Sequence, residues 1–405
     1  MQRYDFIIVG AGIIGLSVAR QMSISAPRAK ILLLEKEENI GEHSSGRNSG
    51  ILHAGFYYTA NSLKARFTVQ GNKAMRLYCR EHDIPVNACG KLVVAMNEQE
   101  LATLYELERR GQCNGSNVRM MDIEEARTLE PGVFSFSKAL YSPDTASLEP
   151  GAVLRALQED LIKAGVDLEF DARFIGHSGK VVHTTAGDFE GGKLVNCAGL
   201  YADKVAQDYG FGQKYTMIPF KGLYLKYAKN TVDVKINVYP VPNLKNPFLG
   251  VHFTKTVDGT IKIGPTAIPA FWRENYSWAS RFSMAEFLEI AWQDACLFTA
   301  NSFAFRDLAF EEMMKYRRDY FIGLAARLVP TIDPSGFGEF TRPGIRAQLL
   351  NRETRELVQD FVVEADDSSV HILNAVSPAF TCAFPFAEFV CSEFVLQESL
   401  GGKIK

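Results

Sequence analysis

The chain has 405 residues, enough for two domains with separate cores, and its 47% hydrophobic and 22% charged residues are typical of a globular protein in water. Its net charge of -3 argues against a nucleic-acid-binding protein, which would normally carry a basic surplus. The seven cysteines include no C-x-x-C pair, which favours buried thiols in a reducing compartment over a disulfide framework or a zinc site, so we expect no metal.

The N-terminal residues form a predicted strand, 4–9, that leads directly into the pattern G-x-G-x-x-G. Gly10 permits the tight turn out of the strand, Gly12 lets backbone approach a pyrophosphate, and Gly15 lets the next helix pack closely. Glu35 closes the following apolar run, twenty positions after Gly15, where its carboxylate can bind a ribose hydroxyl. The spacing predicts a βαβ unit that binds a dinucleotide at a helix N-terminus.

The periodicity of the apolar residues predicts the other regular elements in chain order. Helices are predicted at 14–25, 62–82, 97–112 and 151–164, with a last one from about residue 384. Strands are predicted at 29–35, 91–96, 193–197, 345–349, 357–363 and 370–374.

Four longer stretches have a character of their own. Residues 41–58 are rich in Gly, Ser, His and Asn and are predicted to form a functional loop, whereas 143–150 should break the regular structure. Residues 217–265 alternate as strands of a largely antiparallel sheet would, and 276–328 switch to helical periodicity. One apolar stripe in the helical stretch consists of Leu288, Ala291, Trp292, Ala295 and Cys296.

Glycine turns recur at 10–15, 198–199 and 374–381, which suggests that three distant segments build one nucleotide-binding domain. Its predicted segments are residues 1–75, 150–215 and 340–405. The predicted substrate domain consists of residues 76–149 and 216–339. The expected fold class is therefore α/β, a Rossmann-like three-layer domain interleaved with a domain of antiparallel sheet plus helices.

Several blocks of the sequence resemble known flavoproteins. The glycine motif, Glu35-Lys36 and residues 195–203 together resemble the D-amino-acid-oxidase-like FAD-dependent oxidoreductase superfamily. Other blocks resemble, more narrowly, the L-2-hydroxyglutarate oxidase/dehydrogenase family. They are residues 43–58, 62–65, 89–95, 239–242, 248–254, 344–348 and 374–379. The resemblance therefore covers nearly the whole chain.

The sequence departs from this family at three places. Arg47 stands where a histidine is expected, Leu223 where an acid is expected, and residues 142–149 are not the expected segment. The resemblance implies that Arg47 and Leu223 lie near the substrate or the flavin. The type of reaction is therefore better supported than the identity of the substrate.

The resemblance implies FAD as the cofactor. The residues expected to contact it are Gly10, Gly12, Ile14, Gly15, Glu35, Lys36, Ser44, Ser45, Arg47, Asn48, Ser49, Gly50, Ala198, Gly199, Ser377, Pro378 and Ala379. Within the loop, the small or polar side chains suit the pyrophosphate and the ribityl chain. The segment 377–379 is expected to border the pyrimidine edge of the flavin.

Oxidation of a 2-hydroxy acid needs a base for the hydroxyl proton and a cation for the carboxylate. We expect His53 to be the base, because an imidazole accepts protons near neutral pH, although it could instead only bond a loop carbonyl. We expect Arg346 to bind the carboxylate, because a guanidinium offers a planar fork; the alternative is a surface arginine. His252 is expected to bind substrate or share the proton relay, with a core histidine as its alternative.

Three further residues are candidates for substrate binding. Lys221 is a cation in an otherwise apolar turn and suits a second carboxylate, although a solvated strand lysine is the plain alternative. Tyr57 and Tyr58 are candidates for lining the pocket, and the alternative is that they serve only in packing.

The expected activity is oxidation of an (S)-2-hydroxy acid, with L-2-hydroxyglutarate to 2-oxoglutarate as the best single guess. Electrons would pass from FAD to a quinone or to oxygen. Two alternatives stay open, an FAD-dependent amine or amino-acid oxidase of the same fold and a flavin-binding protein without turnover. An NAD-dependent dehydrogenase is disfavoured, because the blocks at 43–58 and 195–203 have no role in that fold.

The stretch 311–328 mixes cations with Met and aromatic residues, as helices at membrane interfaces do, although an ordinary amphipathic helix is the alternative. No targeting segment precedes the first predicted strand, and no uncharged stretch is long enough to span a membrane. We therefore expect a cytoplasmic protein, with peripheral contact to the inner face of the cell membrane left open.

Overall fold

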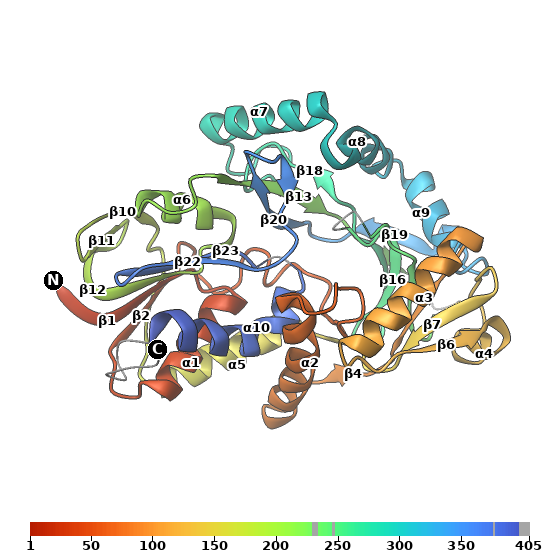
Figure 1. Ribbon diagram of the computed structural model, residues 1–405, viewed down its shortest axis with the longest axis horizontal. Helices are drawn as coiled ribbons and strands as arrows, with labels where there is room; N and C mark the ends of the chain where they lie inside the picture. The colour runs from red at the N-terminus through yellow and green to blue at the C-terminus, as the bar shows by residue number, and fades with distance from the viewer. Residues whose placement is uncertain (229–233, 245–247, 376, 397–405) are drawn as a thin grey trace.

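The computed structural model describes residues 1–228, 234–244, 248–375 and 377–396. Within them, one eight-stranded sheet has the strand order β10-β11-β12-β1-β2-β9, with β23 paired to β12 and β22 paired to β23 (Figure 1). Its strands are β1 (Gln2–Val9), β2 (Ile31–Leu34), β9 (Asp167–Glu169), β10 (Phe174–Ser178), β11 (Val181–Thr184), β12 (Gly187–Asn196), β22 (Val362–Ala365) and β23 (Ser369–Asn374).

The centre of this sheet is parallel and buried on both faces. β1 pairs in parallel with β2 and β12, and β12 pairs in parallel with β23. Alternate residues serve opposite cores, so Ile8 and Leu33 face one side while Ile7 and Leu32 face the other. The first side is covered by α1 (Ile13–Ser25), α2 (Leu63–Glu81), α5 (Pro150–Lys163) and α10 (Ala379–Val390), and the second by α6 (Ala202–Asp208) (Figure 1).

A second part of the molecule is built on two further sheets. The four-stranded sheet has the order β18-β13-β20-β21, with strands β13 (Tyr215–Gly222), β18 (Ile268–Pro269), β20 (Gly344–Asn351) and β21 (Glu356–Leu357). The other sheet has the order β19-β14-β17-β16-β15-β5-β7-β6, with strands β5 (Lys91–Val94), β6 (Arg119–Asp122), β7 (Lys138–Ser142), β14 (Leu225–Tyr227), β15 (Asn237–Pro240), β16 (His252–Lys255), β17 (Ile261–Gly264) and β19 (Phe337–Phe340).

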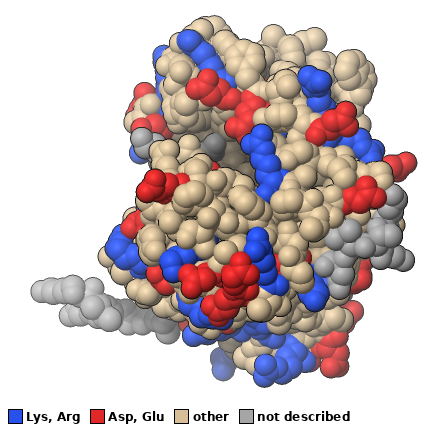
Figure 2. All heavy atoms as spheres, turned by 90° about the vertical axis from the view of Figure 1, so that its right-hand side faces the viewer, with Lys and Arg blue, Asp and Glu red and all other residues tan. Residues whose placement is uncertain are grey.

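Helices and a small sheet complete the described structure. The helices of the second part are α3 (Glu98–Cys113), α4 (Ile123–Leu129), α7 (Met284–Ala300), α8 (Phe305–Met314) and α9 (Arg318–Ala326). The small sheet consists of β3 (Ile51–Leu52), β4 (Val86–Asn87) and β8 (Ala146–Leu148). Acidic and basic side chains are interspersed over the face of the molecule seen in Figure 2.

The sequence-based expectations hold for most elements. The βαβ unit, the helices at 62–82, 97–112 and 151–164, and the strand at 91–96 are confirmed to within a few residues, and the strand at 193–197 is the second half of β12, which begins at Gly187. The expected break at 143–150 instead contains β8, because residues 146–148 pair with β3 and β4. The stretch 217–265 forms strands as expected, but they belong to two different sheets, and β15 pairs in parallel with β5.

The helical stretch 276–328 differs most from the expectation. Its apolar stripe faces outward, since Leu288 and Trp292 are 60% and 68% exposed, while Ile290 and Leu297 are the buried residues of α7. Residues 311–328 do not form one interfacial helix, because the chain leaves α8 at Met314 and restarts at Arg318. Within this stretch Phe321 and Ile322 are core residues of α9.

All three predicted segments of the nucleotide-binding domain contribute strands to the first sheet. Two predicted boundaries do not coincide with changes of layer. β20 pairs with β13 along its whole length, so residues 344–351 belong with the second part, and α2 runs uninterrupted across residue 75. None of the described helices is both long and apolar enough to cross a membrane.

Candidate functional site

A cavity of about 1220 Å³ lies where β1, β2 and β12 end, and it extends to β20. Open α/β sheets bind ligands at this carboxyl edge. All the predicted cofactor residues line the cavity except Gly15 and Gly50. His53 and Arg346 also line it, whereas Lys221, Tyr57, Tyr58 and His252 do not.

The glycine motif leaves space that side chains would fill. Gly10 has a φ of +104°, and a Cβ there would lie 2.6 Å from the carbonyl oxygen of Cys197 at the end of β12. A Cβ on Gly15 would lie 1.9 Å from the carbonyl oxygen of Gly10, so this glycine sets the close contact of α1 with the turn. Gly15 therefore acts through packing, which explains why it does not line the cavity.

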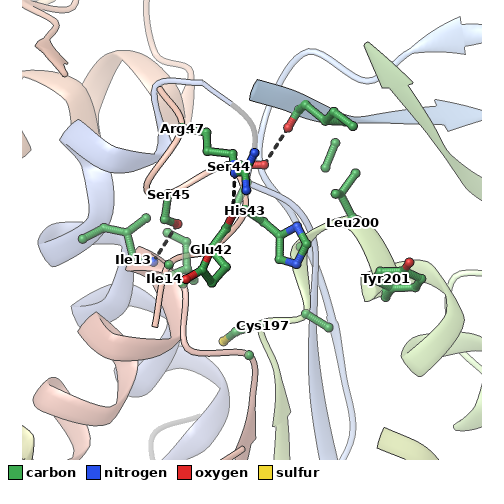
Figure 3. A pocket seen from close by; sticks show the side chains of 18 of the residues that line it. Ile13, Ile14, Glu42, His43, Ser44, Ser45, Arg47, Cys197, Leu200 and Tyr201 are labelled. Atoms are coloured by element: carbon green, nitrogen blue, oxygen red, sulfur yellow. Dashed lines mark hydrogen bonds between the residues drawn. The ribbon is translucent and has the colours of Figure 1, made fainter. Parts of the chain in front are cut away.

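The N-terminus of α1 opens into the cavity. Gly12 is its N-cap, and no side chain of the helix itself caps this end. Ser45 from the 41–58 loop accepts a hydrogen bond from the Ile13 N–H at 2.9 Å (Figure 3). The serine oxygen shows that an oxygen ligand finds a donor at this helix end. The cradle fits the pyrophosphate of a dinucleotide.

Glu35 links the glycine turn to the end of β2. It is buried, and its carboxylate accepts hydrogen bonds from Ala11 N–H at 2.8 Å and Glu37 N–H at 3.1 Å. Burial raises the pKa of Glu35, and the two backbone N–H groups act against that shift. The carboxylate lines the cavity at the position expected for a ribose partner.

The 41–58 loop is fastened to both halves of the molecule. Ser44 donates from its hydroxyl to the Ile345 carbonyl on β20 at 2.7 Å, and Asn48 donates to the Ser45 carbonyl at 2.7 Å. Arg47 donates to the Glu42 carbonyl at 2.6 Å (Figure 3), and its guanidinium lies 4.3 Å from the Tyr276 ring centroid.

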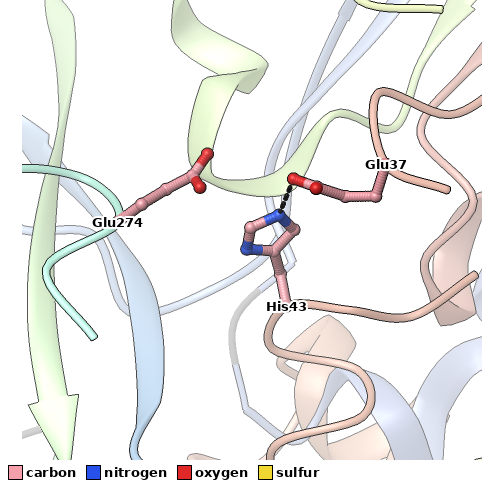
Figure 4. Close-up of side chains that lie close together, drawn as sticks. All are labelled: Glu37, His43 and Glu274. Carbon is pink, nitrogen blue, oxygen red and sulfur yellow. Dashed lines mark hydrogen bonds and ion pairs between the residues drawn. The ribbon is translucent and has the colours of Figure 1, made fainter. Parts of the chain in front are cut away.

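Charged side chains join across one side of the cavity. Lys36 Nζ lies 2.6 Å from a Glu274 oxygen and 2.9 Å from His43 Nε2, and it also contacts Glu37. His43 bonds Glu37 at 2.8 Å, with Glu274 on the opposite side of the ring (Figure 4). Arg281 pairs with both glutamates. We call Lys36, Glu37, His43, Glu274 and Arg281 the charged latch.

The latch has the donor types of a metal site, since the ligand atoms of Glu37, His43 and Glu274 lie within 4.8 Å of one another. Lys36 and Arg281 already supply positive charge to these two carboxylates. Lys36 was expected to touch the cofactor, and it does line the cavity. Its bonds give it a second task, because they tie β2 to the segment that precedes α7.

His53 lies just beyond β3 with its backbone held from two helices. Its N–H donates to Thr381 Oγ1 of α10 at 3.1 Å, and its carbonyl accepts from Asn72 of α2 at 3.0 Å. The ring is buried, and Nδ1 has no partner among the described residues. Burial, with added charge repulsion from Lys91 and Arg346, holds the pKa of His53 well below its usual value. The ring is therefore neutral at physiological pH and can accept a proton.

Arg346 extends from β20 into the cavity. No carboxylate or carbonyl in the described parts of the chain accepts a hydrogen bond from its guanidinium, which lies 5.2 Å from the Phe248 ring centroid. Burial lowers the pKa of Arg346, although an arginine remains charged. An unpaired guanidinium in a cavity is a site for an anion.

Lys221 is not brought to this site. On β13 it pairs with Ile345, whereas Arg346 pairs with Phe220, and neighbouring residues of a strand point to opposite faces. Lys221 therefore faces away from Arg346 and bonds Asn275 at 3.3 Å.

The remaining candidates form a layer beside the cavity. His252 on β16 is buried, bonds the Gly250 carbonyl through Nδ1 at 2.9 Å and stacks on Tyr239 with centroids 3.6 Å apart. Burial holds the pKa of His252 well below its usual value. Burial also raises the pKa of the Tyr57 and Tyr58 phenols, so both remain neutral.

Sequence reasoning missed three parts of this region. Lys91 is a fully buried lysine beside the two histidines, yet its place at the start of a strand looks like that of a solvated residue. Asp203 and Arg273 form a buried ion pair, and the partner 70 positions away leaves no local signal. The charged latch also joins distant segments, which only the tertiary structure brings together.

Comparisons with known proteins place this geometry in context. The model of a family described as FAD dependent oxidoreductase matches residues 5–392. The mitochondrial L-2-hydroxyglutarate dehydrogenase of Nematostella vectensis is 35% identical, with 97% of this chain and 90% of that protein covered. The L-2-hydroxyglutarate dehydrogenase of Escherichia coli K12 is 32% identical, with 96% and 93% covered.

Solved structures share the fold at lower sequence identity. The L-alpha-glycerophosphate oxidase of Mycoplasma pneumoniae with FAD bound superposes with a TM-score of 0.75 at 21% identity, covering 96% of this chain and 94% of that one. The glycine oxidase of Geobacillus kaustophilus gives a TM-score of 0.71 at 19% identity, covering 98% and 95%.

Proposed function

Because this chain belongs to the FAD dependent oxidoreductase family, we propose that it oxidises an (S)-2-hydroxy acid to a 2-oxo acid, with L-2-hydroxyglutarate as the donor. The curated relatives that carry this activity in their names match nearly the whole chain. The single observation that carries the proposal is that one cavity is lined both by a neutral His53 and by Arg346, whose guanidinium bonds no acceptor in the described parts of the chain. One is a base and the other an anion-binding cation.

The residues around the cavity fit FAD. The N-terminus of α1, with Gly12 and Ser45, would hold the pyrophosphate, and Glu35 would hold a ribose hydroxyl. Ser377 to Ala379 border the same cavity from the start of α10. Bound FAD supplies the acceptor for the hydride that leaves the donor carbon.

The protein's own groups prepare the donor for that transfer. Arg346 binds the carboxylate beside the hydroxyl and fixes which hydrogen of the donor carbon faces the cofactor. His53 takes the hydroxyl proton at a ring nitrogen, which is free because burial keeps the ring neutral. Asn72 and Thr381 hold the His53 backbone in place.

The test of this proposal is anaerobic reduction of the purified holoenzyme. L-2-Hydroxyglutarate should bleach the flavin absorbance rapidly, and the D enantiomer should do so far more slowly. Faster bleaching by sarcosine or a D-amino acid would instead identify an amine oxidase. A holoenzyme that no hydroxy acid or amine bleaches would be a flavin-binding protein without turnover.

The electron acceptor we propose is a quinone at a membrane surface. Support comes from exposed apolar side chains on two adjacent helices. Met284, Leu288 and Trp292 follow one another at intervals of four on α7, and Phe310 on α8 contacts Phe298 of α7 with ring centroids 6.0 Å apart. Exposed apolar surface of this kind marks protein or membrane contacts.

Liposome co-sedimentation tests this surface. The variant Leu288→Glu/Trp292→Glu should lose vesicle binding and turnover with a lipid-soluble quinone, while bleaching by substrate stays normal. The matched control is Arg317→Glu/Arg318→Glu at the N-terminus of α9. Fast peroxide formation without vesicle binding by the native protein would identify a soluble oxidase instead.

A further inference from the structure

Lys91 is a buried basic residue without a carboxylate partner among the residues that the structure describes. It begins β5, between Asn237 of β15 and Ser142 of β7, and its side chain is fully buried. Its Nζ has no hydrogen-bond partner within the described residues. Lysines are rarely buried unless they are paired, because an unpaired ammonium is costly to remove from water. A lysine in this position therefore needs an explanation.

Aromatic rings surround the amine. Nζ lies 3.9 Å from the Tyr239 ring centroid, 5.1 Å from that of Tyr57 and 5.7 Å from that of Phe56. Such rings attract a cation through their faces, but they supply no proton acceptor and no negative charge. Among the described residues, the Tyr57 hydroxyl also has no hydrogen-bond partner. Two polar groups in this cage are thus unsatisfied.

The cage adjoins His53 and His252. The Tyr239 ring contacts Lys91 Nζ and also stacks on the His252 ring, with 3.6 Å between the two ring centroids. Both Lys91 and Arg346 lower the pKa of His53 and of His252 by charge repulsion. Two cations therefore act on the same pair of imidazoles, and neither cation has a carboxylate bonded to it among the residues that the structure describes.

We propose that Lys91 Nζ binds the second carboxylate of a dicarboxylic substrate while Arg346 binds the carboxylate beside the hydroxyl. This inference rests on the proposed function and names the residue that selects dicarboxylates over monocarboxylates. The substrate dianion supplies the two negative charges that the protein omits. Lys221, the candidate from the sequence, faces the other side of β13 and bonds Asn275.

The carboxylate must displace one ring of the cage, because Nζ is inaccessible in this structure. Tyr57 loses least by moving, since its hydroxyl makes no hydrogen bond to any residue that the structure describes, whereas the Tyr239 ring is stacked on His252. The Lys91 ammonium would then exchange its contact with that ring for a charge-assisted hydrogen bond to the carboxylate, which is the stronger interaction.

The proposal predicts a proton taken up on binding. Burial lowers the pKa of Lys91 to about 7. The titratable groups around it are His53, His252, Tyr57, Tyr239 and Cys89, none of which is a carboxylate. Above pH 7 the free amine is largely neutral. A bound carboxylate favours the ammonium form and raises this pKa, so affinity for a dicarboxylate falls about tenfold for each pH unit above 7.

Calorimetric titration of the oxidised holoenzyme tests this prediction. The probes are 2-oxoglutarate and 2-oxopentanoate, which have the same chain length and differ only in the second carboxylate. In two buffers of different ionisation enthalpy at about pH 8, binding of 2-oxoglutarate should take up close to one proton. Binding of 2-oxopentanoate should take up none and should not depend on pH in this range.

The variant Lys91→Met should weaken 2-oxoglutarate binding by about 10²-fold, the usual loss for a charge-assisted bond, and abolish the proton uptake. Its affinity for 2-oxopentanoate should not change. Methionine suits an apolar cage, and flavin content and thermal unfolding report whether the variant has folded. The exposed Lys226→Met is the matched control and should leave both ligands unaffected.

Three results would overturn the inference. They are native binding of 2-oxoglutarate without proton uptake, unchanged preference in Lys91→Met, or loss of that preference in Lys221→Met alone. The uptake measurement needs no variant and applies even if Lys91→Met does not fold. A native enzyme that oxidises L-2-hydroxyglutarate while failing these tests would keep the proposed function and lose only the role of Lys91.

Discussion

The ion pair between Asp203 and Arg273 offers a direct test of how the two parts of the molecule are joined. Asp203 belongs to α6, beside the glycine turn at 198–199, and Arg273 belongs to the segment that leads to α7. The two side chains are fully buried and make parallel hydrogen bonds of 2.7 and 2.8 Å. Asp203→Asn keeps the shape and removes the negative charge, which leaves a buried guanidinium without its main partner.

The cost of this change can be worked out from the structure. Breaking a buried pair by removing one partner costs about 3–5 kcal/mol. Glu289 lies 3.8 Å from the same guanidinium and compensates in part, so we expect the free energy of unfolding to fall by about 3 kcal/mol. Unfolding 405 residues carries an entropy of about 0.85 kcal/mol/K, from about 2.1 cal/mol/K per residue. The melting temperature should therefore fall by about 4 °C.

Scanning calorimetry of the holoenzyme measures this shift. The control is Glu190→Gln, which breaks the exposed pair with Arg3 and should leave the melting temperature unchanged within error. Adding Arg273→Met to Asp203→Asn should recover most of the loss, because no unpaired charge then remains buried. A melting temperature within about 1 °C of the native value for Asp203→Asn, or no recovery in the double variant, would refute the reasoning.

The other predictions concern the cofactor and the base. His53→Ala should retain FAD but slow flavin reduction by about 10²–10⁴-fold in stopped-flow measurements. Because the pKa of His53 is held well below 6.5, the native rate at saturating substrate should decline only on the acid side of that value, and a decline of this saturated rate near pH 7 would contradict the assignment. Gly12→Ala should weaken FAD binding because its Cβ enters the cradle, and the protein should still fold because that Cβ meets only the Ser45 side chain, whose hydroxyl oxygen lies 3.0 Å away. In Gly15→Ala the Cβ would meet the Gly10 carbonyl oxygen at 1.9 Å, so this variant should lose about 1–3 kcal/mol of stability or more. Equal melting temperatures for Gly12→Ala and Gly15→Ala would contradict this prediction. Arg281→Ala should speed the release of FAD, measured by its fluorescence, and should make the release rate less sensitive to salt. An unchanged release rate would show that the charged latch does not help to retain FAD.

Local signals in the sequence were sufficient for the elements that carry the cofactor. The run 4–9, its glycines and Glu35 lie within 35 positions, and each follows from a turn, a helix end or a strand period. The fold and the FAD cradle could therefore be predicted. The apolar stripe of α7 could not, because periodicity shows that a helix has an apolar face and does not show what covers it.

The candidate site was predicted only as far as single residues allow. His53 and Arg346 were chosen because their side chains have an evident chemistry; both line the cavity, and their roles stay predictions. Lys221 was chosen by the same reasoning, yet the register of β13 turns it away from Arg346. Lys91 was missed because a lysine at the start of a strand normally reaches water, and only the packing of β7, β15 and the aromatic rings closes that route.

The interleaved first sheet also determines when the protein can acquire its cofactor during synthesis. Strands β1 and β2 emerge early from the ribosome, but β23 joins β12 only after residue 369 has been made. Ser377 to Ala379, at the start of α10, close the same cavity, and Thr381 fixes the His53 backbone. A nascent chain therefore has only the N-terminal part of the nucleotide cradle until residues 369–381 have been made. A chain that ends before residue 369 would lack both this side of the cavity and the contact that holds the His53 backbone, so it should not become coloured.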